Sequence, residues 1–373
     1  MANTITNVVP KLVGLMLPKL RANSVMPRLV NRDFDTLGAQ PGSSIDVPIP
    51  PTIATADVTA ANTPPSTSDI TLSTVNVPLS SWKEAAFYMT DKDLLEVEQD
   101  KLPGVVESAL ASIVSTIDAA ILEAAMNGHG LADDQGGSVF NAIADVTAPQ
   151  KLLNTNKVAR GERYCVFQED AEANLLALEQ FTSGDYVTGF PVESGDMGLT
   201  PKMGMAWVMD QNVGTHTTGT ANANYDLNGA ASVGDKTITV DTGSGTILEG
   251  DTVTIGSYNY GVASTVGGST VTSITLNQGL LEDVADGTSI AVIDTGGNTN
   301  IGNVAFHRDS IVFVSRPFQS SNAAIASQTI SDPVSGLSLR LEVTREHKRD
   351  RWSIDALYGT KVVRPEGVVK IIG

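Results

Sequence analysis

The sequence has little of what several common protein classes need. A single cysteine, Cys165, rules out a disulfide within the chain. Only 24 Lys and Arg stand against 42 Asp and Glu, and the net charge of −18 argues against tight nucleic-acid binding. Residues 1–20 lack a charged start before an apolar core, and Pro10, Gly14 and Pro18 interrupt them. We therefore expect no secretory signal and no membrane span.

Catalytic motifs are also missing. We find no Gly-x-Ser-x-Gly, no Walker-type loop, no His-Glu-x-x-His and no dinucleotide fingerprint. Cys165 lies in a predicted strand over residues 163–167, where it is either a nucleophile or a small buried hydrophobe. We favour the second interpretation, because no activating base is recognisable nearby. The sequence therefore predicts no enzyme and no cofactor.

Two loops contain groups that could bind a metal ion. His129 lies with Asp133 and Asp134 in one loop, and Asp294 to Asn298 hint at a calcium loop. The first set lacks a further ligand at recognisable spacing, and the second lacks regular acid spacing and a terminal Glu. We interpret them as a solvated loop and a tight turn, and we expect no metal.

The composition is that of an ordered protein. Hydrophobic residues make up 41% and charged residues 18% of 373 residues, enough for two or three domains. Frequent Gly and few aromatics favour β-structure with many turns.

Residues 1–32 are expected to form an N-terminal arm. Val9, Leu12, Met16 and Leu20 recur at helical spacing, which predicts a short amphipathic helix. Such an arm cannot bury its apolar stripe alone, so we expect it to pack on another subunit. The arm also carries the basic residues that we assign to this interface: Lys11, Lys19, Arg21, Arg28 and Arg32.

Residues 33–90 are expected to form an extended loop. Two segments, 44–50 and 70–79, alternate apolar with other residues and predict a hairpin. Its prolines restrict it to edge pairing, and a two-stranded excursion is marginal alone in water. We expect a neighbouring subunit to cover it, through Ile45, Val47, Ile49, Leu72, Val75 and Val77.

Residues 91–128 contain the strongest helix signal. Apolar residues from Val106 to Ala124 recur at steps of three and four and predict a helix from Pro103 to Met126. We interpret this stripe as intramolecular core and not as a groove for a partner. The next segment, 129–214, is mixed α/β, with a helix predicted from Glu169 to Phe181.

Residues 215–300 are rich in Gly, Thr and Ser, with short strand patterns and frequent turn signals. Nine acidic residues stand there against Lys236 alone. We interpret the segment as an inserted, acidic, small β-barrel. Residues 301–373 return to stronger strands and end in one over 368–372.

A charged turn lies over residues 345–352. Its basic residues could contact DNA, but the interleaved acids favour a salt-bridge patch between subunits. We assign to this patch Arg345, Arg349, Asp350 and Arg351.

The closing segment carries a local resemblance. Ala-Leu-Tyr-Gly precedes Arg-Pro-Glu-Gly-Val by a few residues, and its key positions are Tyr358, Gly359, Arg364, Pro365 and Glu366. Together with the order of elements over nearly the whole chain, it resembles the coat proteins of the Salmonella-type short-tailed phages. Those are major capsid proteins of tailed double-stranded DNA phages with the Hong Kong phage capsid fold, plus an inserted β-domain.

The resemblance implies an α+β tailed-phage capsid fold and an icosahedral shell of pentons and hexons in the virion. The implied partners are the chain itself, a scaffolding protein, a portal protein and a possible decoration protein. The shell would be assembled in the bacterial cytoplasm and would enclose double-stranded DNA without sequence-specific binding. The short arm implies that the scaffold is a separate protein. No Lys lies between Asp33 and Trp82, so we expect no covalent cross-linking. A tail-fibre or adhesin component and a nanocompartment shell remain alternatives.

Overall fold

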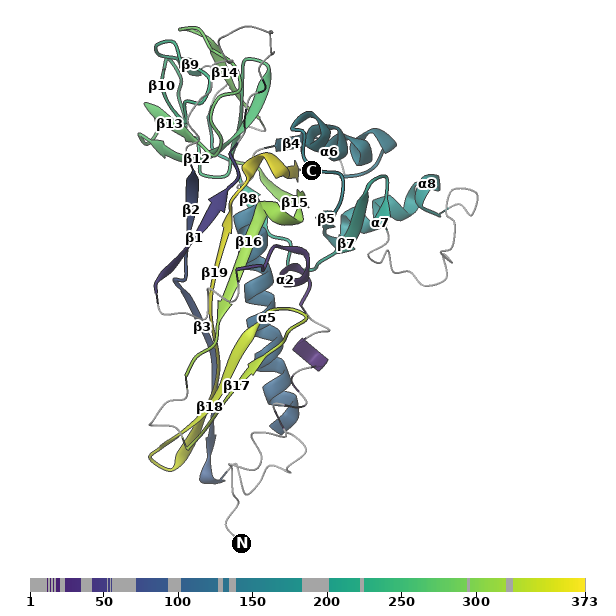
Figure 1. Cartoon of the computed structure of the whole chain (residues 1–373), viewed down its shortest axis with the longest axis vertical. Helices are drawn as coiled ribbons and strands as arrows, with labels where there is room; N and C mark the ends of the chain where they lie inside the picture. Colours follow the sequence, from purple (N-terminus) through teal and green to yellow (C-terminus); the bar gives the residue numbers. More distant parts are fainter. Residues whose placement is uncertain are drawn as a thin grey trace, which may run out of the picture.

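The computed structural model describes most of the chain, and every structural statement below concerns these residues: 12, 14, 16, 18–20, 24–34, 42–51, 53, 55, 72–92, 102–126, 130–133, 139–182, 201–221, 225–293, 296–319 and 325–372. The molecule is elongated (Figure 1). A barrel lies at one end, a helix-flanked sheet lies beside it, and a long sheet with one long helix extends away from both.

The long sheet and helix α5 (Leu102–Met126) pack against each other, and we call this unit the wall. Its five antiparallel strands are β3 (Ser81–Thr90), β16 (Ile311–Arg316), β17 (Ala326–Ser331), β18 (Ser338–Glu346) and β19 (Arg349–Val362). β3 pairs with β19 along its whole length, and α5 packs on these two strands.

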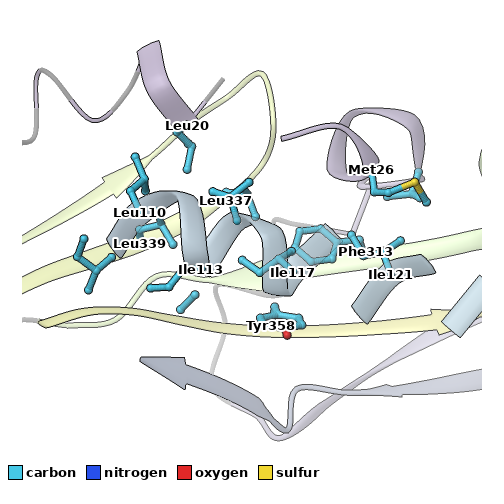
Figure 2. Packing of buried hydrophobic residues seen from close by; sticks show 14 of the residues in the cluster. Leu20, Met26, Leu110, Ile113, Ile117, Ile121, Phe313, Leu337, Leu339 and Tyr358 are labelled. Atoms are coloured by element: carbon cyan, nitrogen blue, oxygen red, sulfur yellow. The ribbon is translucent and has the colours of Figure 1, made fainter. Parts of the chain in front are cut away.

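The predicted helical stripe is confirmed as core. Five of its side chains are almost fully buried: Val106, Leu110, Ile113, Ile117 and Ile121. Burying each stabilises the fold by about 1.5–3 kcal/mol relative to exposure. By length and composition the span Gly104–Met126 could cross a membrane, with a mean hydropathy of 1.7, but core helices pass the same test. Here its apolar stripe faces the long sheet (Figure 2).

A second sheet, which we call the axial sheet, has seven strands. Its path is β4, β20, β15, β5, β7 and β6, and β8 pairs with β15. The strands are β4 (Gly130–Asp133), β5 (Arg163–Phe167), β6 (Pro201–Lys202), β7 (Met205–Met209), β8 (Thr215–Thr217), β15 (Thr299–His307) and β20 (Val368–Ile372). Three helices accompany this sheet: α6 (Ile143–Thr155), α7 (Glu169–Ala177) and α8 (Glu179–Thr182).

The predicted barrel is present between β8 and β15. Six strands close it in the order β10, β13, β12, β11, β14 and β9. They are β9 (Tyr225–Leu227), β10 (Thr237–Asp241), β11 (Thr252–Ile255), β12 (Tyr258–Val266), β13 (Ser273–Leu276) and β14 (Ser289–Val292). Because β8 and β15 pair with each other, the chain leaves and re-enters the axial sheet at one place.

The ribbon of β1 (Ser44–Ile49) and β2 (Ser73–Pro78) is the predicted hairpin. The extended loop expected over residues 33–90 ends before residue 81, because residues 81–90 form β3 of the long sheet. The arm contributes the short helix α2 (Met26–Leu29) beside α5.

Three further expectations differ from the structure. The helix expected over 169–181 breaks at Leu178, between α7 and α8. Helix α6 was not expected, and it contains the buried Pro149. The charged turn over 345–352 is mostly strand, because only His347 and Lys348 separate β18 from β19. Lys348 takes a positive φ of 55° there, which lets this short turn close.

Candidate functional site

The charged patch on the long sheet pairs within its own subunit. The Arg345 guanidinium lies 2.7 Å from Asp91 Oδ1 and 2.8 Å from Asp350 Oδ1. Arg349 pairs with Glu346 and lies over the Tyr88 ring, 4.1 Å from its centroid. These ion pairs join β18 and β19 to each other and to Asp91, which directly follows β3. Their role in contacts between subunits stays a prediction.

Arg351 also forms its ion pair within its own subunit. Its guanidinium lies 2.7 Å from Glu84 Oε2 on β3, across the strand pair. In the register Arg351 stands opposite Tyr88 and Glu84 stands opposite Asp355, so this ion pair runs diagonally across four positions of the sheet.

An adjacent cluster was missed in the sequence. Arg340 donates two hydrogen bonds to Asp355, at 3.1 and 2.6 Å, and Trp82 Nε1 donates to the same carboxylate. Arg340 also lies over the Phe318 ring, and this ring lies 5.5 Å from that of Trp82. Trp82 stays 64% exposed. The four chain segments are far apart in sequence, so no local pattern announces the cluster.

One face of the ribbon is covered within its own subunit. Ile45, Val47 and Val77 are buried against Val312 and Val314. These three ribbon side chains offer no surface to a neighbour, so their assignment to a subunit interface is corrected.

The far end of the ribbon differs from its base. Ile53 is 72% exposed and Leu72 is 75% exposed, while Ile49 and Val75 are partly buried. Large apolar side chains at this exposure are candidates for contact with another molecule. Of the predicted interface set, Leu72 is the residue whose surface is available.

The arm is also covered by its own chain. Leu12, Met16 and Leu20 are buried in the core that includes α5, so the expectation that this stripe packs on another subunit is wrong. Figure 2 shows Leu20 in this core. Lys19 pairs with Glu107 on α5, at 3.5 Å.

Two other basic residues of the arm are described. Arg28 is exposed and Arg32 is half-buried. The remaining two, Lys11 and Arg21, lie outside the described residues.

The closing motif fixes the ribbon to β19. A Cβ on Gly359 would lie 2.3 Å from the backbone oxygen of Pro78, so only glycine allows β2 to approach this closely. Tyr358 is buried in the main core.

Beyond Gly359, the motif lines a cavity. The short helix η3 (Pro365–Gly367) follows Arg364, and Glu366 O accepts a hydrogen bond from Asn156. A cavity of about 570 Å³ lies where this turn meets the barrel, lined in part by Lys236, Glu249 and Arg364.

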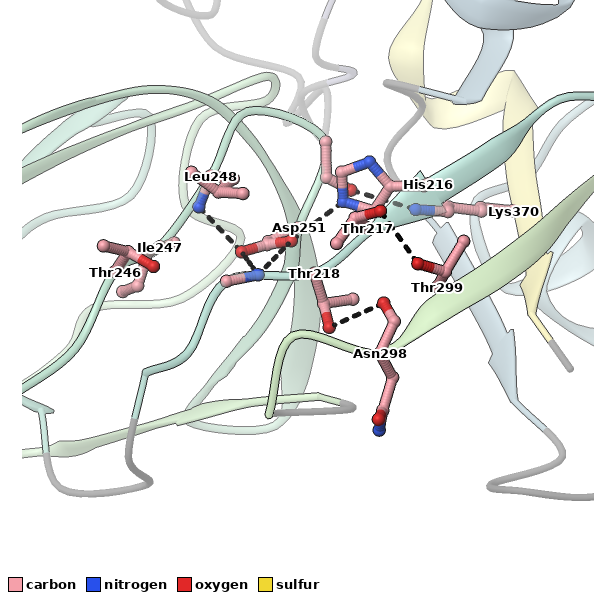
Figure 3. Close-up of polar contacts among 12 residues, drawn as sticks. His216, Thr217, Thr218, Thr246, Ile247, Leu248, Asp251, Asn298, Thr299 and Lys370 are labelled. Atoms are coloured by element: carbon pink, nitrogen blue, oxygen red, sulfur yellow. Dashed lines mark hydrogen bonds and ion pairs between the residues drawn. The ribbon is translucent and has the colours of Figure 1, made fainter.

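A buried carboxylate fastens the barrel to the axial sheet (Figure 3). Asp251 accepts hydrogen bonds from Leu248 N at 2.7 Å and Gly219 N at 3.1 Å, and its other oxygen lies 2.9 Å from His216 Nε2. From β20, the buried Lys370 donates to Gly250 O at 3.1 Å. These contacts tie the barrel to both β8 and β20.

The candidate chemistry of the sequence finds no support in the described residues. Burial raises the pKa of the Cys165 thiol, which is the opposite of what a nucleophile needs. In the part of the chain that the structure describes, no three His, Cys, Asp or Glu side chains gather as a metal site. His129, Asp134 and Asp294 lie outside that part.

Comparisons with known proteins agree with this fold. A sequence model described as "Phage capsid protein" matches residues 52–237, half of the chain. The chain is similar to one in a structure of Mycobacterium phage Che8, at 16% identity and a TM-score of 0.53, covering 93% of this chain and 90% of that one. It is also similar to one in the capsid structure of the cyanophage P-SCSP1u, at 11% identity and a TM-score of 0.51, covering 93% and 87%.

No curated protein matches the chain in sequence. At these identities the solved structures establish the fold, and the family follows from the sequence match, whose span runs from the ribbon through α5 and the axial sheet into the barrel. The chain belongs to the phage capsid protein family, and it is a shell-forming capsid protein with the fold of phage major capsid proteins.

Proposed function

We propose that the chain is the major capsid protein of a tailed double-stranded DNA phage, which assembles into pentons and hexons of an icosahedral shell around the genome. A separate scaffolding protein guides assembly, a portal protein occupies one vertex, and no covalent cross-link joins the subunits. The protein acts as a structural component and not as an enzyme. Assembly takes place in the host cytoplasm, and the virion is the final location.

The ribbon carries this proposal. Its base is held in its own subunit by Val312, Val314 and the close approach at Gly359. Its far end presents Ile53 and Leu72 to solvent. A ribbon that is fixed at one end and apolar at the other is suited to reach a neighbour, and closed symmetry then repeats each weak contact around the shell.

The charge distribution supports enclosure without binding. The net charge is −18, and the barrel carries most of its charge as exposed acids. An acidic wall does not adhere to the polyanion inside it. We propose that the barrel is the counterpart of the inserted domain of the Salmonella-type coat proteins and that it contacts neighbours across capsomers.

The absence of cross-linking rests on the lysines. The first Lys after Asp33 is Lys83, which is exposed on β3 opposite Ala356. Lys83 lies in the long sheet and not in the ribbon, so its amine is not at the ribbon end that we propose to contact a neighbour. We therefore propose that non-covalent contacts alone hold the shell together.

The test is electron microscopy of the purified chain, expressed alone and with its candidate scaffold. We expect uniform closed shells with scaffold and irregular particles without it. Closed shells without scaffold would overturn the scaffold part and favour self-sufficient assembly, as in a nanocompartment. Monomers or thin fibres under both conditions would overturn the shell itself.

A matched pair of variants tests the ribbon. Leu72→Asp places a charge at the exposed apolar end, and we expect it to abolish closed shells while the subunit stays folded. Thr74→Asp adds the same charge at an exposed polar position of β2 and should leave assembly nearly intact. Normal closed shells from Leu72→Asp, as from Thr74→Asp, would remove the ribbon end from the interface.

A further inference from the structure

His307 lies where the arm, the axial sheet and the end of the chain meet. It is the last residue of β15, and it directly precedes the short 3-10 helix η2 (Arg308–Ser310). Both the arm and the closing segment, residues 363–367, form hydrogen bonds with η2. The proposed assembly gives this half-buried histidine no role.

The His307 ring accepts a hydrogen bond from the backbone of η2. Its Nδ1 atom lies 3.2 Å from Asp309 N, and a backbone N–H can only donate. His307 therefore caps the start of η2, as N-cap side chains do in longer helices. A ring nitrogen that accepts a hydrogen bond carries no proton, so this contact requires the neutral imidazole with its proton on Nε2.

Asp309 connects the capped turn to the arm. Its Oδ1 atom accepts a hydrogen bond from Asn31 Nδ2 at 3.0 Å. Asn31 is 8% exposed, and its backbone pairs with the strand that follows η2: Asn31 N donates to Ile311 O, and Phe313 N donates to Asn31 O, each at 3.0 Å. The position of Asp309, which His307 fixes, therefore decides whether the arm keeps its side-chain contact with η2.

Ser310 connects the same turn to the closing segment. Its carbonyl oxygen accepts hydrogen bonds from Val363 N at 2.8 Å and from Arg364 N at 3.2 Å. A Cβ on Gly367 would overlap Ser310 Oγ, so η2 and η3 are in close contact. The closing segment therefore holds one end of η2 in place whatever the state of the ring, and the arm is the partner that depends on the cap.

Protonation reverses the hydrogen-bonding role of the ring. A proton on His307 Nδ1 turns the acceptor into a donor and sets it against the Asp309 N–H, which is also a donor. We propose that His307 is a pH-sensitive switch, which holds η2 and the arm together while the ring is neutral and releases the arm when the ring is protonated. The switch lies within the single subunit and stands apart from the proposed assembly.

Charged groups of both signs face His307 from the elements packed around it. They are Glu162 and Arg163 at the start of β5, Asp309 on η2 and Arg364 before η3. The other charged residue of η2, Arg308, pairs with Asp33 at 3.3 Å and with Glu162 at 3.6 Å.

The balance of these groups keeps the ring neutral. Burial lowers the pKa of His307 from 6.5, and the cations of Arg163 and Arg364 act in the same direction. The carboxylates of Asp309 and Glu162 act against burial and do not outweigh it. The folded chain therefore resists the proton that would break the cap.

The direction of the pH effect follows. Well above pH 6.5 the ring is neutral in the folded and the unfolded chain, and the cap contributes its full stability. As the pH falls below 6.5, the unfolded chain binds a proton that the folded chain resists, so stability is lost. The loss approaches about tenfold in the equilibrium constant per pH unit and levels off below the folded-state pKa.

His307→Asn separates the switch from a merely structural role. Asparagine is a favoured N-cap residue whose oxygen can accept from Asp309 N, but it does not titrate. We measure hydrogen exchange of the full chain and follow the peptide spanning residues 24–31, corrected for the intrinsic effect of pH. In the native chain we expect its protection to fall by up to about tenfold per pH unit between about pH 6.5 and about pH 5, and in His307→Asn to stay level.

Two controls show whether the effect belongs to His307 and to the arm. His347→Asn, at an exposed residue of the turn between β18 and β19, should follow the native profile. The peptide spanning residues 252–266 belongs to the separate core of the barrel and should keep its protection in every sample. Parallel losses in the arm and the barrel would mean that acid unfolds the whole chain, which would overturn release of the arm.

The comparison of the native chain with His307→Asn cancels the titration of all other groups. Equal pH profiles of the arm in these two proteins would overturn the proposal. His307→Gln carries the same acceptor and repeats the test if the Asn variant does not fold. Asp309→Ala removes the bond to Asn31 and should lower protection of the arm already at neutral pH; an unchanged arm would show that η2 does not hold it.

Discussion

The barrel and the ribbon are both antiparallel β-structures with alternating apolar residues, but they differ in how fully those residues are buried within the subunit. The barrel closes on itself, and its inward side chains, among them Tyr225, Tyr260 and Ile274, are fully buried. The ribbon has two strands, one face covered by its own subunit, and a bare end at Ile53 and Leu72. The alternating sequence pattern is therefore the same in both regions. The closed sheet of the barrel buries its apolar face by itself, whereas the open ribbon needs a neighbouring molecule to cover its exposed end.

The largest loss of stability is expected from a substitution in the buried core of the barrel. Tyr225 OH donates to Gly245 O at 2.7 Å and accepts from Val271 N at 2.9 Å. Its ring also fills the space that a side chain on Gly243 would need. Tyr225→Ala leaves a cavity and strands both backbone groups, so we expect it to lower the free energy of unfolding by about 3–5 kcal/mol.

Urea unfolding of the full chain measures this loss, and Tyr258→Ala is the control. Tyr258 is on β12 of the same barrel but is 37% exposed, so its loss should cost less than about 1 kcal/mol. Equal losses would mean that the barrel is not a closed core.

The next effect is expected where the ribbon joins the wall. Gly359→Ala would place a Cβ 2.3 Å from Pro78 O, and since both partners are backbone, β2 must move away from β19. We expect a loss of up to about 3 kcal/mol, measured by thermal or urea unfolding. Gly268→Ala is the control, because nothing lies within 4 Å of its added Cβ. A neutral Gly359→Ala would show that the ribbon base is loose.

The ribbon itself can be divided by two truncations. Val77→Ala removes buried methyl groups and should lower the free energy of unfolding by about 2 kcal/mol. Leu72→Ala removes exposed surface and should leave subunit stability within about 0.5 kcal/mol while it weakens shell formation. Unfolding and sedimentation velocity on the same samples separate the two effects. If Leu72→Ala also destabilised the subunit, the bare end would be folded against its own chain.

The elements of this fold follow from local patterns, because each depends on a periodicity that the sequence carries. The α5 stripe and the strands at 163–167 and 368–372 lie where the pattern predicts them. Helix α6 was missed because Pro149 usually marks a break, and here its ring is buried within the helix.

What covers each apolar face could not be predicted, because it depends on segments distant in sequence. Leu12, Met16 and Leu20 looked unsatisfied until α5 was placed beside them. Val77 looked like an interface residue until Val312 was placed beneath it.

The smallest effect is expected at the charged patch, where the sequence favoured contacts between subunits and the structure shows pairs within one. Arg349 pairs with Glu346 and stacks on Tyr88, all near solvent. A double-mutant cycle of Arg349→Ala with Glu346→Ala should give a coupling below about 1 kcal/mol that shrinks in high salt, because water and ions screen exposed pairs. If shells still close with Arg349→Ala, the pairs serve the wall of one subunit. If the subunit is unaffected but shells fail, these residues exchange partners on assembly, and the patch joins the ribbon end as a surface completed only by a neighbour.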